Sequence, residues 1–330
     1  MSLTLRRLYS TKPTTAAQTI ASTFLSTLQA RAPRLCFRSQ LLDINQLAQL
    51  RASLLHHSLS RLALHLPVPP CYHLVYFTPS EREDALGADG SDVGLIKPPR
   101  PFTRRMWAGG ELEWVRENKL RVGQMVQEKT EVKSVEAKAS SSGEDMLVVG
   151  VEKQFENSEG LALVERRNWI FKHEIDPQNR PPLPPLPPPA SFTDARHWRD
   201  ITNTSISLFR FSALTFNAHK IHYDRDWCRE VEGHRDCVVH GPLNLIHMVD
   251  LWSSVMAVRF ADRADVDVDV NVDWDKGVLL PKKVTYRAMS PFYVGDKYRI
   301  LMGEEREKVT EMKVVNGSGK VGMMGSIERW

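Results

Sequence analysis

Two features are missing from this sequence of 330 residues, and each absence excludes a class of protein. No apolar run approaches the roughly 18 residues that a membrane-spanning helix needs, so we expect no membrane span. The four cysteines, Cys36, Cys71, Cys228 and Cys237, form neither a Cys-x-x-Cys pair nor a zinc-binding spacing. We therefore expect reduced thiols, no metal and no cofactor.

Acidic residues are absent from residues 1–42, which contain six basic residues instead. Because the whole chain carries +4 and this segment carries +6, the remaining residues carry a net charge of −2. The body of the chain therefore has no basic stripe, and a nucleic-acid partner is not expected.

The Arg-, Ser- and Thr-rich composition of residues 1–42 is typical of a mitochondrial transit peptide. Residues 7–10 (RLYS) also resemble the processing sites of mitochondrial presequences. We expect a leader that directs the protein to the mitochondrial matrix. A basic tail without a targeting role is the alternative.

The remaining length is sufficient for two domains of about 100–150 residues, each with its own core. The proline-rich residues 181–190 suit a semi-rigid linker, although such a stretch can also bind a proline-recognition domain. We predict an N-terminal domain over 43–180 and a C-terminal domain over 191–330.

The N-terminal domain is predicted to contain one helix, over 45–65, followed by strands. The first strand is RRMWAGGELEW, and three more follow between Gly123 and Lys172, with hairpin turns at 140–143 and 157–160. Such consecutive strands favour an antiparallel meander.

The C-terminal domain is predicted to open with a strand, SISLFRF, and to continue with a helix from Gly241 to about Phe260. This helix is apolar around most of its circumference, so other elements should surround it. Four strands follow: KKVTYRAMS, KYRILMGEE, VTEMKVV and VGMMGSIE. The Asp-rich run between them, from Asp262 to Asp275, has Val270 where a calcium-binding loop needs glycine, so we expect an acidic surface insertion.

A curved antiparallel sheet around a long buried helix is the hot-dog arrangement. The N-terminal domain, with its shorter helix and its meander, could be a degenerate copy of the same unit. The predicted fold class is therefore α+β, a double hot-dog in which two antiparallel sheets each wrap a helix and form a pseudo-dimer.

Three sequence blocks carry a resemblance to a known family. They are RRMWAGG at 104–110, FSALTFNAHKIHYDRDW followed by VVHGPL within 211–243, and VTYRAMSPFYVGD at 284–296. Together they resemble the MaoC-like hydratase/dehydratase superfamily, above all the branch with the fungal mitochondrial hydroxyacyl-thioester dehydratases type 2 and the mesaconyl-CoA hydratases. In this superfamily an acidic residue precedes a histidine by five positions. His222 matches the histidine, and Asn217 stands at the acidic position.

Dehydration of a hydroxyacyl thioester requires removal of a proton from C2 and protonation of the hydroxide that leaves C3. Histidine can accept and return a proton near neutral pH, so we predict that His222 is the acid/base. Asn217 cannot act as a base, and we predict that its amide orients the departing hydroxyl or a water.

The thioester oxygen also needs a hydrogen-bond donor while it carries enolate charge. Gly241 begins the predicted buried helix, and Pro242 suits the first helical turn. The Gly241 N–H, assisted by the helix dipole, is the predicted oxyanion donor, and we place the adjacent His240 with it at the thioester.

Two cations near the motif, Lys220 and Arg225, could contact the phosphopantetheine or an acidic carrier protein; a solvated basic face is an equal alternative. Asp224 is predicted to cap a short helix. A metal held by His219, His222, Asp224 and His240 would instead indicate a metal-dependent hydrolase.

The resemblance implies reversible dehydration of (3R)-3-hydroxyacyl thioesters to trans-2-enoyl thioesters in mitochondrial type II fatty acid synthesis. The partner would be an acyl carrier protein or a CoA thioester, and a homodimer is possible. One alternative is a hydratase of branched or dicarboxylic enoyl-CoA, such as a mesaconyl thioester. Another is a non-catalytic protein that binds acyl thioesters.

Overall fold

A computed structural model describes residues 12–31, 36–55, 62–140, 142–187, 190–192, 195–264 and 280–330. The presequence-like residues 7–10 and residues 265–275 of the predicted acidic insertion lie outside the described residues.

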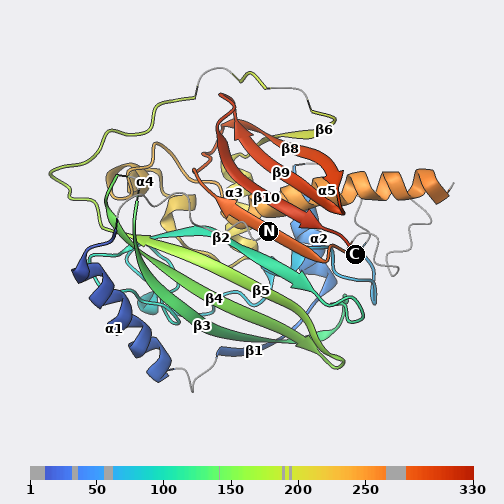
Figure 1. Cartoon of the computed structure of the whole chain (residues 1–330), viewed down its shortest axis with the longest axis horizontal. Coiled ribbons are helices and arrows are strands. Elements are labelled where there is room, and N and C mark those ends of the chain that lie inside the picture. The colour runs from blue at the N-terminus through green and yellow to red at the C-terminus, as the bar shows by residue number, and fades with distance from the viewer. Residues whose placement is uncertain are drawn as a thin grey trace.

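The described chain forms one antiparallel sheet of ten strands, curved along its length (Figure 1). The first five strands are β1 (Cys36–Leu41), β2 (Arg104–Trp114), β3 (Met125–Ala139), β4 (Asp145–Asn157) and β5 (Gly160–Lys172). The second five are β6 (His197–Thr202), β7 (Lys283–Ala288), β8 (Lys297–Arg306), β9 (Val309–Asn316) and β10 (Val321–Glu328).

The two halves of the sheet repeat one topology. The order across the sheet is β1-β3-β4-β5-β2-β7-β10-β9-β8-β6, so in each half the first strand lies at the edge and the second at the centre. The halves meet where β2 pairs with β7, from Gly109 opposite Arg287 to Glu113 opposite Lys283. This duplication confirms the double hot-dog, with the correction that the two expected sheets are joined into one.

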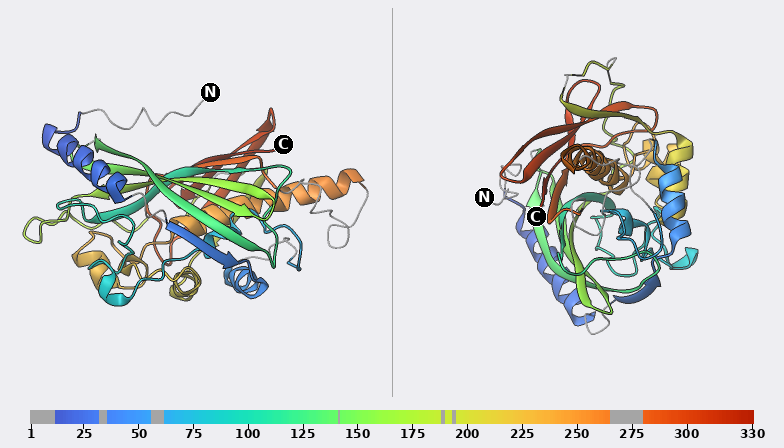
Figure 2. Two further views of the ribbon diagram at one scale, coloured as in Figure 1. Left: turned by 90° about the horizontal axis from the view of Figure 1, so that it is seen from below. Right: turned by 90° about the vertical axis from the view of Figure 1, so that its right-hand side faces the viewer.

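The second half wraps its helix as predicted. Helix α5 (Gly241–Ala264) packs against β8 and β9, and Leu245, Met248 and Trp252 on it are fully buried. Figure 2 (right) shows this helix end-on inside the curve of the C-terminal strands. Burial of such large apolar side chains contributes about 1.5–3 kcal/mol each and holds the helix start in place.

The first half differs from the prediction, because its described part wraps no long helix. Helix α2 (Ile44–Ser53) starts where Asp43 accepts a hydrogen bond from Gln46 N, and it packs against α3 and the short 3-10 helix η1 (Tyr72–Val75). The strands curve instead around the segment that contains η1 (Figure 2, right), and Phe77, which follows η1 in the chain, belongs to the same buried core. The expected helix over 45–65 therefore ends at Ser53.

Other predicted elements are confirmed or corrected. The hairpins β3–β4 and β4–β5 turn where expected, and α4 (Arg225–Glu230) begins at Asp224, whose carboxylate accepts from Trp227 N. The SISLFRF segment is not a strand but helix α3 (Ser205–Leu214). Thr204 and Ser207 form a capping box at its start, which favours a helix over the extended form.

Two elements that the sequence did not predict lie in the expected leader. Helix α1 (Thr15–Arg31) packs on β3 and β4 through Ala17, Ala21, Phe24 and Leu28, and β1 pairs with β3. The described part of the expected leader therefore contributes to the fold. The described part of the proline-rich segment has no regular secondary structure and belongs to the long connection from β5 to β6 (Figure 1). Within the described residues, no helix combines the length and hydropathy required for a membrane crossing.

Candidate active site

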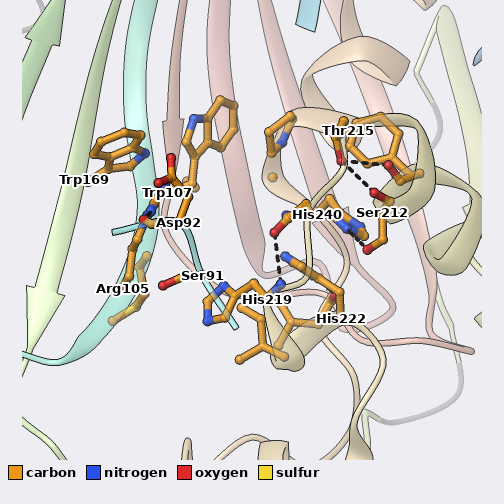
Figure 3. Close-up of a pocket in the computed structure, with 18 of the residues that line it drawn as sticks. Ser91, Asp92, Arg105, Trp107, Trp169, Ser212, Thr215, His219, His222 and His240 are labelled. Atoms are coloured by element: carbon orange, nitrogen blue, oxygen red, sulfur yellow. Dashed lines mark hydrogen bonds between the residues drawn. The ribbon is translucent and has the colours of Figure 1, made fainter. Parts of the chain in front are cut away.

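All the predicted site residues except Arg225 line a cavity of about 1110 Å³, to which both halves of the molecule contribute. The second half supplies the loop between α3 and α4, here called the catalytic loop (residues 215–224), and the start of α5. The first half supplies β2, β5 and the loop 86–92. Figure 3 shows Trp107 and Trp169 on one side, with His222, His240 and Ser212 opposite them.

His222 lies on the 3-10 helix η3 (Lys220–His222) and is 8% exposed. Its Nδ1 is 2.7 Å from the carbonyl oxygen of Val238, and Val238 N donates to Ile221 O at 2.7 Å. Because a carbonyl can only accept, Nδ1 carries the proton and Nε2 keeps its lone pair. Burial lowers the pKa of His222 to about 4, so the ring is a neutral base at neutral pH.

Asn217 shapes the catalytic loop. The chain enters this loop through Phe216, which has a left-handed φ of 47°. The Oδ1 atom of Asn217 then accepts from His219 N at 3.1 Å, and its main-chain N donates to Ser212 O at 2.9 Å. Since Oδ1 is engaged within the loop, the Nδ2 amide is the part of the side chain left to meet a substrate.

Gly241 lies at the first turn of α5, where main-chain N–H groups have no acceptor within the helix. The indole of Trp107 covers it, and a Cβ on residue 241 would lie 2.2 Å from Trp107 Cε3. Only glycine fits this contact. Trp107 is held in turn by stacking on Tyr286, with ring centroids 4.4 Å apart. The residue that carries the predicted oxyanion donor is thus packed against a side chain of the other half.

The ring of His240 stacks on the ring of His222, with centroids 3.6 Å apart and planes inclined by 15°. Its Nε2 is 2.9 Å from Ser212 Oγ, while its Nδ1 is enclosed without a hydrogen-bond partner. Burial, followed by the neighbouring His222 and His219, holds the pKa of His240 well below its usual value. These contacts favour a neutral ring that supports His222. The place of His240 at the thioester stays a prediction.

The structure does not bring together the two predicted carrier contacts. Lys220 lines the cavity, but its ammonium donates to Ala88 O at 2.8 Å and lies 4.1 Å from the Trp227 ring. Arg225 does not line the cavity; its Nε lies 3.5 Å from a carboxylate oxygen of Asp236. Asp224 caps α4, and within the described ranges no group of three metal-binding side chains is found.

Sequence reasoning missed the contribution of the first half. Arg105 lies 4.1 Å from the ring centroid of Trp169 and donates to Asp92 O, and both residues of this cation–π pair line the cavity. Lys153 and Arg167 line the same wall. Two signals were present in the sequence. One is the RRMWAGG block, which contains Arg105, and the other is the Gly- and Asp-rich stretch GADGSDVG at 87–94, whose backbone turns bring it against the catalytic loop.

The fold is that of MaoC-like hot-dog proteins, as comparison with solved structures shows. A MaoC-like dehydratase from Phytophthora capsici superposes with a TM-score of 0.57 at 13% identity, covering 90% of this chain and 95% of that one. HtdX of Mycobacterium tuberculosis superposes with a TM-score of 0.56 at 12% identity, covering 89% of this chain and 100% of that one.

The sequence comparisons are more specific. The family model of hydroxyacyl-thioester dehydratase type 2 matches residues 71–294, and the chain belongs to this family. The chain is 36% identical to the mesaconyl-C(4)-CoA hydratase of Chloroflexus aurantiacus over 190 residues, 56% of this chain and 64% of the relative. It is 27% identical to the mitochondrial hydroxyacyl-thioester dehydratase type 2 of Schizosaccharomyces pombe over 256 residues, 71% of this chain and 77% of the relative. The match to the first relative therefore spans less than two thirds of that protein.

Proposed function

We propose that this protein is a hydro-lyase that interconverts (3R)-3-hydroxyacyl and trans-2-enoyl thioesters in mitochondrial type II fatty acid synthesis. The observation that carries this proposal is the position of His222, a buried neutral imidazole that lines the same cavity as the start of α5. The family supports it, since its name and those of both relatives describe addition or removal of water.

In this mechanism the thioester oxygen lies at the Gly241 N–H, where the helix dipole stabilises the enolate. His222 Nε2 removes the C2 proton and passes it to the hydroxyl as the C3–O bond breaks, which releases water and returns the imidazole to neutrality. The Nδ2 amide of Asn217 orients the hydroxyl.

The carrier is an acyl carrier protein or CoA, and the protein acts in the mitochondrial matrix. The names of two fungal relatives, both mitochondrial, and the acid-free leading segment support this location. Because α1 and β1 pack on the sheet, we place any cleavage before Thr15.

A second candidate is a hydratase of dicarboxylic enoyl-CoA, and the charged wall of the first half favours it. Lys153 and Arg167 form ion pairs with the buried Glu128 and Glu165, whereas Arg105 on the same wall stacks on Trp169 and donates to the main-chain oxygen of Asp92. Burial lowers the pKa of Arg105, the nearby Asp92 and Asp89 counteract this in part, and a carboxylate on the acyl chain would stabilise the charged guanidinium further.

Turnover of matched substrates tests both candidates. Purified protein should hydrate crotonyl-CoA and dehydrate 3-hydroxyacyl chains of graded length on carrier protein and on CoA. A kcat/KM at least 10-fold higher for a carboxylated enoyl-CoA than for its neutral isostere would favour the second candidate. Absence of turnover on all these thioesters would exclude both and leave a binding protein.

A further inference from the structure

The loop 86–92 of the first half is locked onto the catalytic loop of the second half. Lys220 N donates to Asp89 O at 2.8 Å, and the Lys220 ammonium donates to Ala88 O at 2.8 Å. Gly90 has a φ of 77°, and a Cβ there would lie 2.1 Å from Ala218 O. Two main-chain segments this close have little freedom to separate, so the side chains between them are held in fixed positions.

This docking brings a buried carboxylate to the catalytic loop. Asp89 Oδ1 accepts from Ser91 N at 3.0 Å and from Ser91 Oγ at 2.8 Å. Its other oxygen, Oδ2, lies 3.3 Å from His219 Nε2, and both side chains are almost fully buried. The two atoms are within ion-pair distance, although the ring N–H is not aligned for a hydrogen bond in this state.

His219 lies beside His222 in the cavity wall (Figure 3). Their ring centroids are 5.6 Å apart and their planes are nearly perpendicular, at 87°. Of the two ring nitrogens of His219, Nε2 faces Asp89 and is enclosed, which leaves Nδ1 toward the cavity. A carboxylate next to Nε2 favours the tautomer with its proton there, so that Nδ1 is a hydrogen-bond acceptor.

We propose that Asp89 and His219 together replace the carboxylate that is missing at position 217, with His219 Nδ1 holding the reacting water beside His222. The inference rests on the proposed function and adds a group from the first half to its machinery. Asn217 has no carboxylate, and its Oδ1 already accepts a hydrogen bond from His219 N within the loop.

The proton balance is complete with these groups. In the hydration direction the water donates a hydrogen bond to His219 Nδ1 through one of its hydrogens, and this hydrogen remains bonded to the oxygen. The other passes to His222 Nε2 as the oxygen bonds to C3, and His222 then delivers a proton to C2. His219 touches the reacting water and is a catalytic residue, whereas Asp89 acts through it and is a positioning residue.

The test compares Asp89→Asn and His219→Gln with the wild type in the hydration of crotonyl-CoA. Asn at 89 keeps an Oδ1 for both bonds from Ser91, so the fold should be retained, which circular dichroism and the melting temperature verify. We expect kcat to fall about 10-fold or more in Asp89→Asn and about 10²-fold in His219→Gln, with KM little changed. Asp84→Asn, on the exposed part of the preceding loop, is the matched control and should retain full activity.

The pH profile separates positioning from simple packing. Burial, His222, Arg105 and His234 all lower the pKa of His219, and Asp89 is the anion that faces its ring. Removal of this anion should lower the pKa further and shift the acidic limb of kcat/KM to lower pH in Asp89→Asn. The triple variant Asn217→Asp/His219→Asn/Asp89→Asn should regain activity relative to His219→Gln, because it restores a carboxylate in the catalytic loop.

Folded Asp89→Asn and His219→Gln proteins with wild-type kcat and an unshifted acidic limb would overturn this inference while the proposed function stands. A wild type without activity on any thioester would remove the proposed function, and the inference with it. The two failures are therefore distinguishable.

Discussion

At the scale of single residues, the site combines several imidazoles that burial keeps neutral. His222 is the one whose ring orientation is set from both sides, by the Val238 carbonyl at Nδ1 and by the stacked ring of His240. A charged His222 would be unfavourable beside His240 and His219, whose own pKa values burial lowers. The ring is thus neutral at neutral pH, with its Nε2 lone pair available to substrate, and the low pKa favours release of a proton once it has been accepted.

Replacement of His222 by alanine should lower kcat for crotonyl-CoA hydration by about 10²-fold or more, the range of general acid–base catalysis. The melting temperature should change little, since the lost hydrogen bond is a single one to Val238 O. Steady-state kinetics and a thermal melt provide the two measurements. Unchanged kcat in the alanine variant would remove His222 from the mechanism.

Two substitutions of Asn217 test whether its side chain acts on the substrate or only holds the loop. Asn217→Asp retains the oxygen that accepts from His219 N and should keep measurable activity, whereas Asn217→Ala loses both this bond and the Nδ2 amide and should be inactive. The measurement is kcat/KM of both variants on the same substrate, which shows whether position 217 needs a polar side chain. An alanine variant as active as the aspartate variant would show that position 217 needs no polar group.

At the scale of elements, the start of α5 is where the two halves depend on each other. The helix is positioned by its buried apolar surface against β8 and β9, and its first residue is covered by Trp107 from β2. Strand β2 also joins the two halves by pairing with β7. A shift of β2 would therefore move the Trp107 side chain away from the N-terminus of α5.

Gly241→Ala is therefore expected to destabilise the protein by about 1–3 kcal/mol, the usual cost of overpacking, and to reduce activity. Urea unfolding gives the first quantity and crotonyl-CoA hydration the second. The double variant Gly241→Ala/Trp107→Ala relieves the clash, so its loss relative to Trp107→Ala alone should be smaller. Equal losses in the two backgrounds would contradict the contact.

At the scale of the whole molecule, the two halves repeat one strand order but supply different parts of the site. The second half supplies the catalytic loop and α5, while the first half supplies the opposite wall with its aromatic and charged side chains. Folding buries the cavity side chains of both halves together. The stability of the protein is therefore coupled to the protonation of these side chains.

Stability should therefore depend on pH through the buried histidines. Burial lowers the pKa of His222 and of His234 to about 4, and it lowers those of His219 and His240 as well. In the unfolded chain these groups titrate near 6.5, so between about pH 6.5 and 4 the unfolded state binds more protons. The contribution of the neutral buried histidines to the free energy of unfolding is therefore fully present above pH 6.5, and it is lost as the pH falls from 6.5 to about 4.

Urea unfolding at pH 7 and at pH 5 measures this effect as a drop in the free energy of unfolding. His222→Ala should show a smaller drop than the wild type, because one of the contributing groups is gone. A free energy of unfolding that is constant over this range would mean that the rings are solvated in the folded protein.

Much of this protein was determined by local sequence pattern. The alternation in 125–172 specified the meander, and the apolar circumference of 241–260 specified a surrounded helix, because both depend on neighbours along the chain. The motif with His222, Asn217 and Gly241 is also local, and these residues do line one cavity.

Only the tertiary structure decided which residues lie opposite this motif in the cavity. The SISLFRF segment took its helical form from its cap, the first half wraps no long helix in its described part, and Asp89, Arg105 and Trp107 reach the site across more than a hundred residues of chain. Such contacts arise from the pairing of β2 with β7 and from loop docking, which leave no periodic trace in a single sequence.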